Sequence, residues 1–115
     1  MQVTIWHNPR CSKSRQTLKL IEDNGIKPDV RRYLDDPPSM TELRRVLGQL
    51  GCTARDLVRV KEPLFKELGL NNAGASEAQL LAALVEHPKL IERPVVISDK
   101  GAVIGRPPDN VLQIL

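Results

Sequence analysis

The pattern of apolar and polar residues in the first third of the chain predicts two strands with a helix between them. Val3 to Trp6 is a β-branched and aromatic run, and His7-Asn8-Pro9 predicts a turn at its end. Apolar side chains then recur at helical spacing from Ser12 to Gly25, where the glycine is expected to end the helix. Asp29 to Leu34 predicts the second strand. We therefore expect the chain to open with a β-α-β unit.

Helical spacing dominates the middle of the chain. Ser39 or Thr41 is positioned to cap a helix that follows Pro37-Pro38. Every strong apolar pattern after that helix and before His87 is also helical. The three stretches are Ala54 to Val58, Leu64 to Leu68 and Glu77 to Glu86. We expect a helical insertion at about residues 39–91.

The last part of the chain returns to strand patterns. Pro94 to Ile97 and Ala102 to Ile104, separated by Asp99-Lys100-Gly101, predict a β-hairpin. Pro107-Pro108 is expected to start a short last helix that ends at Leu115. This order, with a cysteine at the first strand-to-helix turn and a proline opening the third strand, resembles the thioredoxin and glutaredoxin fold. The resemblance implies an α/β protein with a mixed four-stranded sheet and a helical insertion between strands 2 and 3.

Length and composition limit the classes of protein to consider. With 115 residues, we expect a single domain covering residues 1–115. The hydrophobic share of 41% and the charged share of 27% are typical of globular proteins and argue against disorder. The longest apolar runs are far shorter than the ~20 residues of a bilayer span, and the N-terminus lacks the pattern of a signal peptide. We expect a cytoplasmic protein with no membrane partner.

Charge and cysteine content narrow the choice of ligand. The net charge of +3 suits a small anion as well as it suits a nucleic acid. With one Trp, one Tyr and one Phe the chain has no aromatic platform for bases, so we expect no nucleic-acid partner. Cys11 and Cys52 lack the companions of a structural zinc site and are too few for a disulfide scaffold. We therefore predict a free thiol and no metal.

The segment from His7 to Arg15 places Cys11 where a helix begins. Unpaired N–H groups of a first helical turn favour anions, and nearby cations lower a cysteine pKa. Arg10, Lys13 and Arg15, with His7 as a further candidate, would supply positive charge. The segment therefore predicts a reactive thiolate. In the alternative interpretation, Cys11 is a buried small hydrophobe beside an ordinary helix cap.

Cys11-Ser12-Lys13-Ser14 is a C-x-x-S pattern, so a hydroxyl stands where a C-x-x-C enzyme has its resolving thiol. Ser14 either donates to the Cys11 thiolate or satisfies backbone groups of the first turn, and both interpretations stay open. Cys52 lies in no electropositive run, which favours an inert thiol over a resolving one.

Three arginines outside this segment are candidates for binding an oxyanion: Arg59, Arg93 and Arg106. Solvated surface arginines are the ordinary alternative. Arg93 precedes Pro94, and a residue before a proline is held extended. Guanidinium groups match tetrahedral oxyanions in bidentate fashion, so arginines that converged on Cys11 would bind one beside the nucleophile.

Several motifs together resemble the glutaredoxin-dependent arsenate reductase family. They are H-N-P-x-C-x-x-S-R at residues 7–15, Tyr33-Leu34 with Pro37-Pro38, Glu67-Leu68-Gly69-Leu70, E-R-P-V-V-I at residues 92–97 and G-R-P-P at residues 105–108. The match covers nearly the whole chain. The short form of the chain resembles an arsenate-reductase-like subgroup, and the segment from Arg59 to Pro63 is one residue shorter than in the best-known members.

This resemblance implies residue roles and a reaction. Cys11 would be the nucleophile, His7 and Ser14 would lower its pKa, and Arg59, Arg93 and Arg106 would clamp the oxyanion. The Arg93–Pro94 peptide bond would be cis. The substrate would be arsenate or a similar small oxyanion, with glutathione as co-substrate, glutaredoxin as partner protein and no bound cofactor.

Two other functions compete with arsenate reduction at this stage. The Spx regulators share the fold and are non-enzymatic interaction proteins, but they typically carry C-x-x-C where this chain has Ser14. A glutathione-linked thiol transferase would need Cys11 but not three arginines.

Overall fold

The computed structural model describes residues 2–71 and 74–115. The chain divides into two compact units, one formed by Met1–Asp36 with Arg93–Leu115 and the other by Pro37–Glu92. The second unit corresponds to the predicted insertion. The predicted domain 1–115 and insertion 39–91 include residues 1, 72 and 73, which lie outside the described residues.

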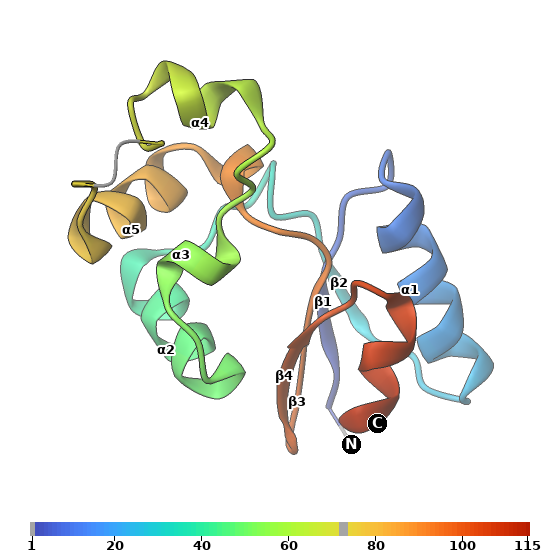
Figure 1. The fold of residues 1–115 in the computed structure, drawn as a ribbon. Helices are drawn as coiled ribbons and strands as arrows, with labels where there is room; N and C mark the ends of the chain where they lie inside the picture. The colour runs from blue at the N-terminus through green and yellow to red at the C-terminus, as the bar shows by residue number, and fades with distance from the viewer. Residues whose placement is uncertain (1, 72–73) are drawn as a thin grey trace. The chain divides into compact units, whose positions relative to one another are not determined.

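The first unit is built on a mixed four-stranded sheet in the order β2-β1-β3-β4 (Figure 1). Its elements are β1 (Thr4–Trp6), α1 (Ser12–Asp23), β2 (Asp29–Arg31), β3 (Val95–Ser98), β4 (Gly101–Ile104) and the 3-10 helix η2 (Pro108–Gln113). β1 is parallel to β2 and antiparallel to β3, and β3 is antiparallel to β4. The predicted α/β class and mixed four-stranded sheet are confirmed.

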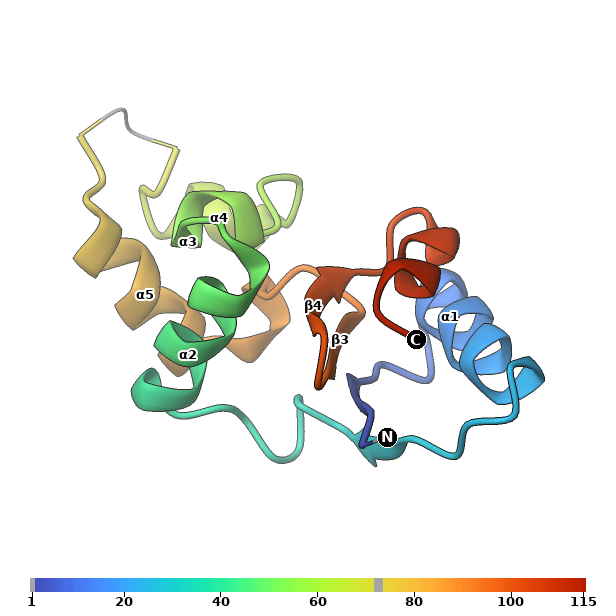
Figure 2. The same ribbon diagram turned by 90° about the horizontal axis from the view of Figure 1, so that it is seen from below.

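The core of the first unit lies between the sheet and one layer of helices. α1 and η2 run beside each other against the sheet (Figures 1 and 2). Their inward side chains meet apolar residues of β1 and β3, because alternate residues of a strand face the same side. The buried cluster consists of Val3, Ile5, Ile21, Val96, Val111 and Ile114. Burial of this apolar surface stabilises the face of the sheet on which α1 rests.

The second unit is helical. It contains α2 (Met40–Leu50), α3 (Ala54–Leu57), α4 (Pro63–Glu67), α5 (Glu77–Glu86) and the 3-10 helix η1 (Pro88–Leu90). Ser39, rather than Thr41, caps α2: its hydroxyl accepts from the backbone of Glu42, whose carboxylate accepts from Ser39 N–H. This reciprocal pair is a capping box, which satisfies two N–H groups that lack helical partners. Apolar faces of α2, α3 and α5 form the core of this unit.

Several boundaries of the elements differ from the sequence prediction. β2 ends at Arg31 instead of Leu34, because the Arg32 carbonyl accepts from the N–H groups of Asp35 and Asp36 and closes a turn. Val58 lies outside α3 and pairs with Ile91 in an isolated β-bridge. The last helix is a 3-10 helix that ends at Gln113, before Leu115.

Two features are absent from the described residues, a membrane-spanning helix and a cluster of metal-binding side chains. None of the helices in residues 2–71 and 74–115 has the length and hydropathy to cross a membrane. Within the same ranges, no group of three or more His, Cys, Asp or Glu side chains is placed to hold a metal ion.

Candidate active site

The sheet topology brings three separate segments to one edge of the first unit. Because β1 and β2 are parallel and β3 is antiparallel to them, β1 and β2 end where β3 begins. The register confirms this: Trp6, the last residue of β1, is paired with Arg31 and with Val95. The loop that leads to Cys11, the turn after β2 and the residues before β3 therefore share this edge.

Asn8 shapes the loop between β1 and Cys11. It is buried, and its carbonyl oxygen accepts from the Cys11 N–H at 2.9 Å. Its side-chain Oδ1 accepts from the Arg10 N–H at 3.0 Å, and its own N–H donates to Ser14 Oγ at 3.0 Å. An asparagine side chain that accepts from the backbone two residues later replaces a backbone turn. Asn8 thus sets the entry into α1, a role that the sequence prediction missed although Asn-Pro is a typical turn pair.

Cys11 stands at the N-cap position of α1 with φ −97° and ψ 122°. Its thiol is half-buried, and the backbone N–H groups of Lys13 and Ser14 donate to it, as does the Arg93 side chain. Burial raises the pKa of the Cys11 thiol, but the hydrogen bond and charge of Arg93 and the two backbone N–H groups outweigh it, so the pKa is lowered. The site favours a thiolate.

Arg93 is held between two side chains. Its guanidinium hydrogen-bonds Cys11 and also contacts the hydroxyl of Tyr33, a residue with 0% exposure. Tyr33 was missed as a site residue. The pattern offered one indication, a tyrosine among charged residues next to a turn, but contact with Arg93 depends on the placement of β2 and β3 on either side of β1.

His7 and Ser14 are brought together but act on the site indirectly. His7 Nδ1 and Ser14 Oγ are 2.7 Å apart, and both side chains are buried. Burial lowers the pKa of His7, and the nearby positive charges of Arg32 and Arg15 lower it further. His7 is therefore a neutral imidazole at pH 7, rather than a cation beside Cys11. Ser14 reaches the sulfur through its backbone N–H, while its hydroxyl is engaged with His7 and Asn8.

The cations expected beside Cys11 lie on the surface. Arg10, Lys13 and Arg15 are exposed, and Arg15 donates to the Pro9 carbonyl at 2.8 Å. The charge that lowers the Cys11 pKa comes from Arg93, which is distant in sequence.

Gly105 joins the segments that carry Arg93 and Arg106. Its N–H donates to the Pro94 carbonyl at 2.8 Å, and Arg106 Nη1 donates to the Arg93 carbonyl at 3.5 Å. A Cβ at Gly105 would lie 2.7 Å from Thr17 Oγ1 and 2.8 Å from Pro94 Cγ. Only glycine allows this approach without displacement. The Arg93–Pro94 and Arg106–Pro107 peptide bonds are both cis.

A sequence model described as the ArsC family matches residues 6–114. The chain belongs to the ArsC family. The family resemblance drawn from the motifs is thereby confirmed.

Close relatives of this ArsC-family chain span its full length. It is 48% identical to a Haemophilus influenzae protein named arsenate reductase, and the alignment covers 100% of both chains. It is 51% identical to the uncharacterized Escherichia coli protein YfgD, over 99% of this chain and 97% of that one. Among solved structures, an arsenate reductase from Vibrio cholerae superposes with a TM-score of 0.96 at 52% identity, covering 100% of this chain and 98% of the other.

Arg59 of this ArsC-family chain belongs to the helical unit, where it is paired with carboxylates. Its Nη1 lies 2.9 Å from Glu62 Oε2 and its Nε lies 3.7 Å from Glu92 Oε1. Its backbone N–H donates to Leu90 O at 2.7 Å. These contacts connect the segment after α3 to the segment after η1. The predicted contact of Arg59 with an oxyanion at Cys11 stays a prediction.

Cys52 has the opposite environment to Cys11. Burial raises the pKa of its thiol, and the nearby carboxylates of Asp56 and Glu77 raise it further. This environment disfavours a thiolate, in agreement with the interpretation of Cys52 as an inert thiol.

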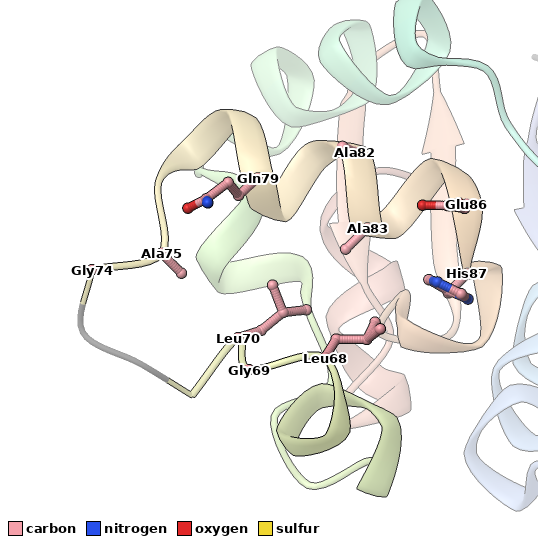
Figure 3. A pocket seen from close by; sticks show the side chains of 10 residues that line it. All are labelled: Leu68, Gly69, Leu70, Gly74, Ala75, Gln79, Ala82, Ala83, Glu86 and His87. Atoms are coloured by element: carbon pink, nitrogen blue, oxygen red, sulfur yellow. The ribbon is translucent and has the colours of Figure 1, made fainter.

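The helical unit also contains a cavity of about 420 Å³ beside α5 (Figure 3). Leu68, Leu70 and Ala83 line it, with Glu86 and His87 near the end of α5. Its described lining residues include neither cysteine, arginine nor lysine, so it lacks the nucleophile and the positive charge that distinguish the Cys11 site.

Proposed function

We propose that this chain reduces arsenate to arsenite with the Cys11 thiolate as nucleophile. The observation that carries the proposal is the placement of the Cys11 sulfur, which accepts hydrogen bonds from the Lys13 and Ser14 backbone and from Arg93. A low-pKa thiol beside fixed positive charge suits attack on an anion, because the same groups stabilise the thiolate and the bound substrate. Arsenate is proposed as the substrate because several relatives of this chain are named arsenate reductase.

In the first step the Cys11 thiolate attacks arsenic and displaces one arsenate oxygen. A sulfur–arsenic bond forms, an arsenic–oxygen bond breaks, and the oxygen leaves as water after taking up protons. Arsenic remains pentavalent. The Arg93 guanidinium, already at the sulfur, would bind the remaining oxygens. Arg106, whose side chain reaches the Arg93 carbonyl, would act beside it, with Arg59 as the third arginine of the clamp.

In the second step a glutathione thiolate attacks the Cys11 sulfur. A disulfide forms, the sulfur–arsenic bond breaks, and its electron pair stays on arsenic, which leaves as trivalent arsenite. Two thiols have then been oxidised to one mixed disulfide. A glutaredoxin thiolate attacks the glutathione sulfur of this disulfide and releases the Cys11 thiolate. The reaction requires no bound cofactor.

We favour an external thiol for the second step because neither of two candidate positions in the chain, Ser14 and Cys52, offers a reactive internal thiol. Ser14 has a hydroxyl in place of a resolving thiol, and that hydroxyl contacts His7 and Asn8. The environment of Cys52 raises its thiol pKa, so less of it is thiolate and its attack on the Cys11 sulfur is slower.

The test is arsenite production by the purified protein with arsenate, glutathione and glutaredoxin, beside a Cys11→Ser variant. We expect arsenite from the unchanged chain and none above background from the variant. Equal arsenite from both proteins would contradict the proposal. Reduction of a glutathione–protein mixed disulfide without any arsenite would instead support the thiol transferase function.

A further inference from the structure

We propose that Tyr33 is a positioning residue that holds the Arg93 guanidinium against the Cys11 sulfur. The inference rests on the proposed role of Cys11 as nucleophile and adds a residue that does not touch the reacting sulfur. Tyr33 lies two residues after Arg31 and Arg93 lies two residues before Val95, and Trp6 of β1 pairs with both Arg31 and Val95. The Tyr33 hydroxyl and Arg93 Nε are both buried at this edge of the sheet, and the Arg93 guanidinium interacts with both Tyr33 and Cys11, so Tyr33 acts through Arg93.

The position of Tyr33 is determined by a tight turn. The Arg32 carbonyl accepts from Asp35 N–H at 3.0 Å and from Asp36 N–H at 2.9 Å, which closes the chain around Tyr33. The tyrosine side chain is the buried one in this turn, whereas its neighbours Arg32 and Leu34 are exposed. The turn therefore directs one large polar-tipped side chain into the protein.

Arg31 connects this turn to β1 through both its side chain and its backbone. Its guanidinium lies 5.8 Å from the ring centroid of Trp6, and its Nε donates to the Asp36 carbonyl at 3.0 Å. The backbone adds a further contact, from His7 N–H to the Arg31 carbonyl at 2.8 Å. Trp6 and His7 immediately precede the loop that carries Cys11. Tyr33 is thus held in register with Cys11 through the β1–β2 pair, independently of Arg93.

Arginine needs such a partner because its long side chain has many rotamers. An arginine that must present one N–H edge to a sulfur loses rotamer freedom, and each further fixed contact reduces that cost at the moment of reaction. Tyrosine is suited to the task, since it has two side-chain torsions and a hydroxyl oxygen that accepts from a guanidinium.

The test is the Tyr33→Phe variant of the full chain, which removes one oxygen and keeps the ring. We expect Cys11 alkylation by iodoacetamide to become about threefold or more slower at acidic pH, where its rate follows the thiolate fraction. The midpoint of the pH–rate curve should move upward. An unchanged curve, or one moved downward, would refute the proposal.

Two controls separate positioning from a general loss of structure. Ser98→Ala removes another buried hydroxyl of the same sheet, one that donates to Ile114 O at 2.7 Å at the far end of β3. It should lower the melting temperature without moving the alkylation curve. In an Arg93→Ala background, Tyr33→Phe should no longer affect alkylation, because both changes remove the same contact. A full additional effect there would show that Tyr33 does not act through Arg93.

The alkylation readout needs no arsenate, so the two proposals fail separately. If the chain produces no arsenite but Tyr33→Phe slows alkylation, the function is wrong and the positioning role stands. If arsenite is produced and Tyr33→Phe leaves alkylation unchanged, the function stands and the positioning role is wrong.

Discussion

At Cys11, burial and hydrogen bonding act on the thiol pKa in opposite directions, and hydrogen bonding prevails. We expect alkylation of Cys11 to follow a pH curve with its midpoint below the ~8.5 of a free cysteine. Cys52 should react more slowly in the folded protein, because burial and two carboxylates raise its pKa. Mass spectrometry of the alkylated peptides identifies which thiol has reacted. A Cys11 midpoint at or above the free value would contradict the role of Cys11 as nucleophile.

His7 should make the stability of the folded chain depend on pH in the acidic range. Its pKa in the folded chain is lowered from about 6.5, so below that pH the unfolded chain binds a proton that the folded chain resists. Stability should therefore fall as the pH decreases from 6.5 toward the lowered pKa of His7. His7→Gln keeps a polar side chain without this protonation. Its melting temperature should decline less between about pH 7.5 and about pH 5 than that of the unchanged chain.

His87→Gln is the matched control for this prediction. His87 is the other histidine of the chain and lies at the C-cap of α5, in the helical unit. The melting curves of this variant show how much of any change comes from replacing a histidine by glutamine at a different position. An equal decline for His7→Gln and the unchanged chain would show that the His7 proton is not linked to folding.

Arg93 and Arg106 should matter more for turnover than for stability. Replacing either by alanine is expected to lower turnover with arsenate by about one to two decades, since a charge-assisted contact contributes about 1.5 to 3 kcal/mol. Arg93→Lys should also be impaired, because an ammonium group cannot contact the sulfur, Tyr33 and an oxyanion as a planar fork does. Steady-state kinetics and thermal melts of the three variants provide the comparison. Full activity in both alanine variants would exclude them from the clamp.

At the scale of elements, the close approach of the residue after β4 to α1 depends on a glycine at position 105. A Cβ there would meet the side chains of Thr17 and Pro94 at less than 3 Å, so α1 or the start of β3 has to shift. We expect Gly105→Ala to cost about 1 to 3 kcal/mol in the free energy of unfolding, as overpacking does. Activity should fall as well, because Arg93 and Arg106 flank these contacts. Denaturant titration and arsenite assays measure the two effects.

Gly48→Ala is the control for this substitution. Gly48 lies inside α2, and a Cβ there would meet nothing within 4 Å. Alanine is a better helix former than glycine, so this variant should gain about 0.5 to 1 kcal/mol in stability. If both variants were equally stable, packing at Gly105 would not be the reason for its glycine.

At the scale of the whole molecule, the two cysteines have opposite environments, because the surroundings lower the pKa of the Cys11 thiol and raise that of the Cys52 thiol. Cys52→Ser should therefore retain turnover with arsenate, glutathione and glutaredoxin. Without glutaredoxin, the expected trapped species is a Cys11–glutathione mixed disulfide, because a second thiol is needed to release it. Intact-mass measurement before and after reduction detects this adduct.

Two results would contradict regeneration of the Cys11 thiolate by an external thiol. One is loss of turnover in Cys52→Ser together with a Cys11–Cys52 disulfide after exposure to arsenate. The other is sustained turnover with thioredoxin and no glutathione. Either result would leave the family and the fold unchanged, since those rest on the match over residues 6–114 and on the sheet.

Features that depend on neighbouring residues were predictable from the sequence. Cys11 lies at the start of a helix because a strand, an Asn-Pro turn and a helical pattern follow one another within 20 residues, and helix N–H groups reach a side chain only two or three residues earlier. The order of elements, the cap near Ser39 and the glycine after α1 are likewise local. The family followed from motifs that remain in order along the chain.

Features that depend on contacts between distant segments were decided by the tertiary structure. Tyr33, Arg93 and Cys11 meet because β1, β2 and β3 share an edge, and no local pattern records that pairing. The neutral state of His7 follows from its burial, whereas sequence reasoning counted it as a candidate cation. The length of β2 was overestimated because the Arg32 carbonyl is bound by a turn instead of a strand. The sequence thus determined where the thiol stands, and the folded sheet determined which charge acts on it.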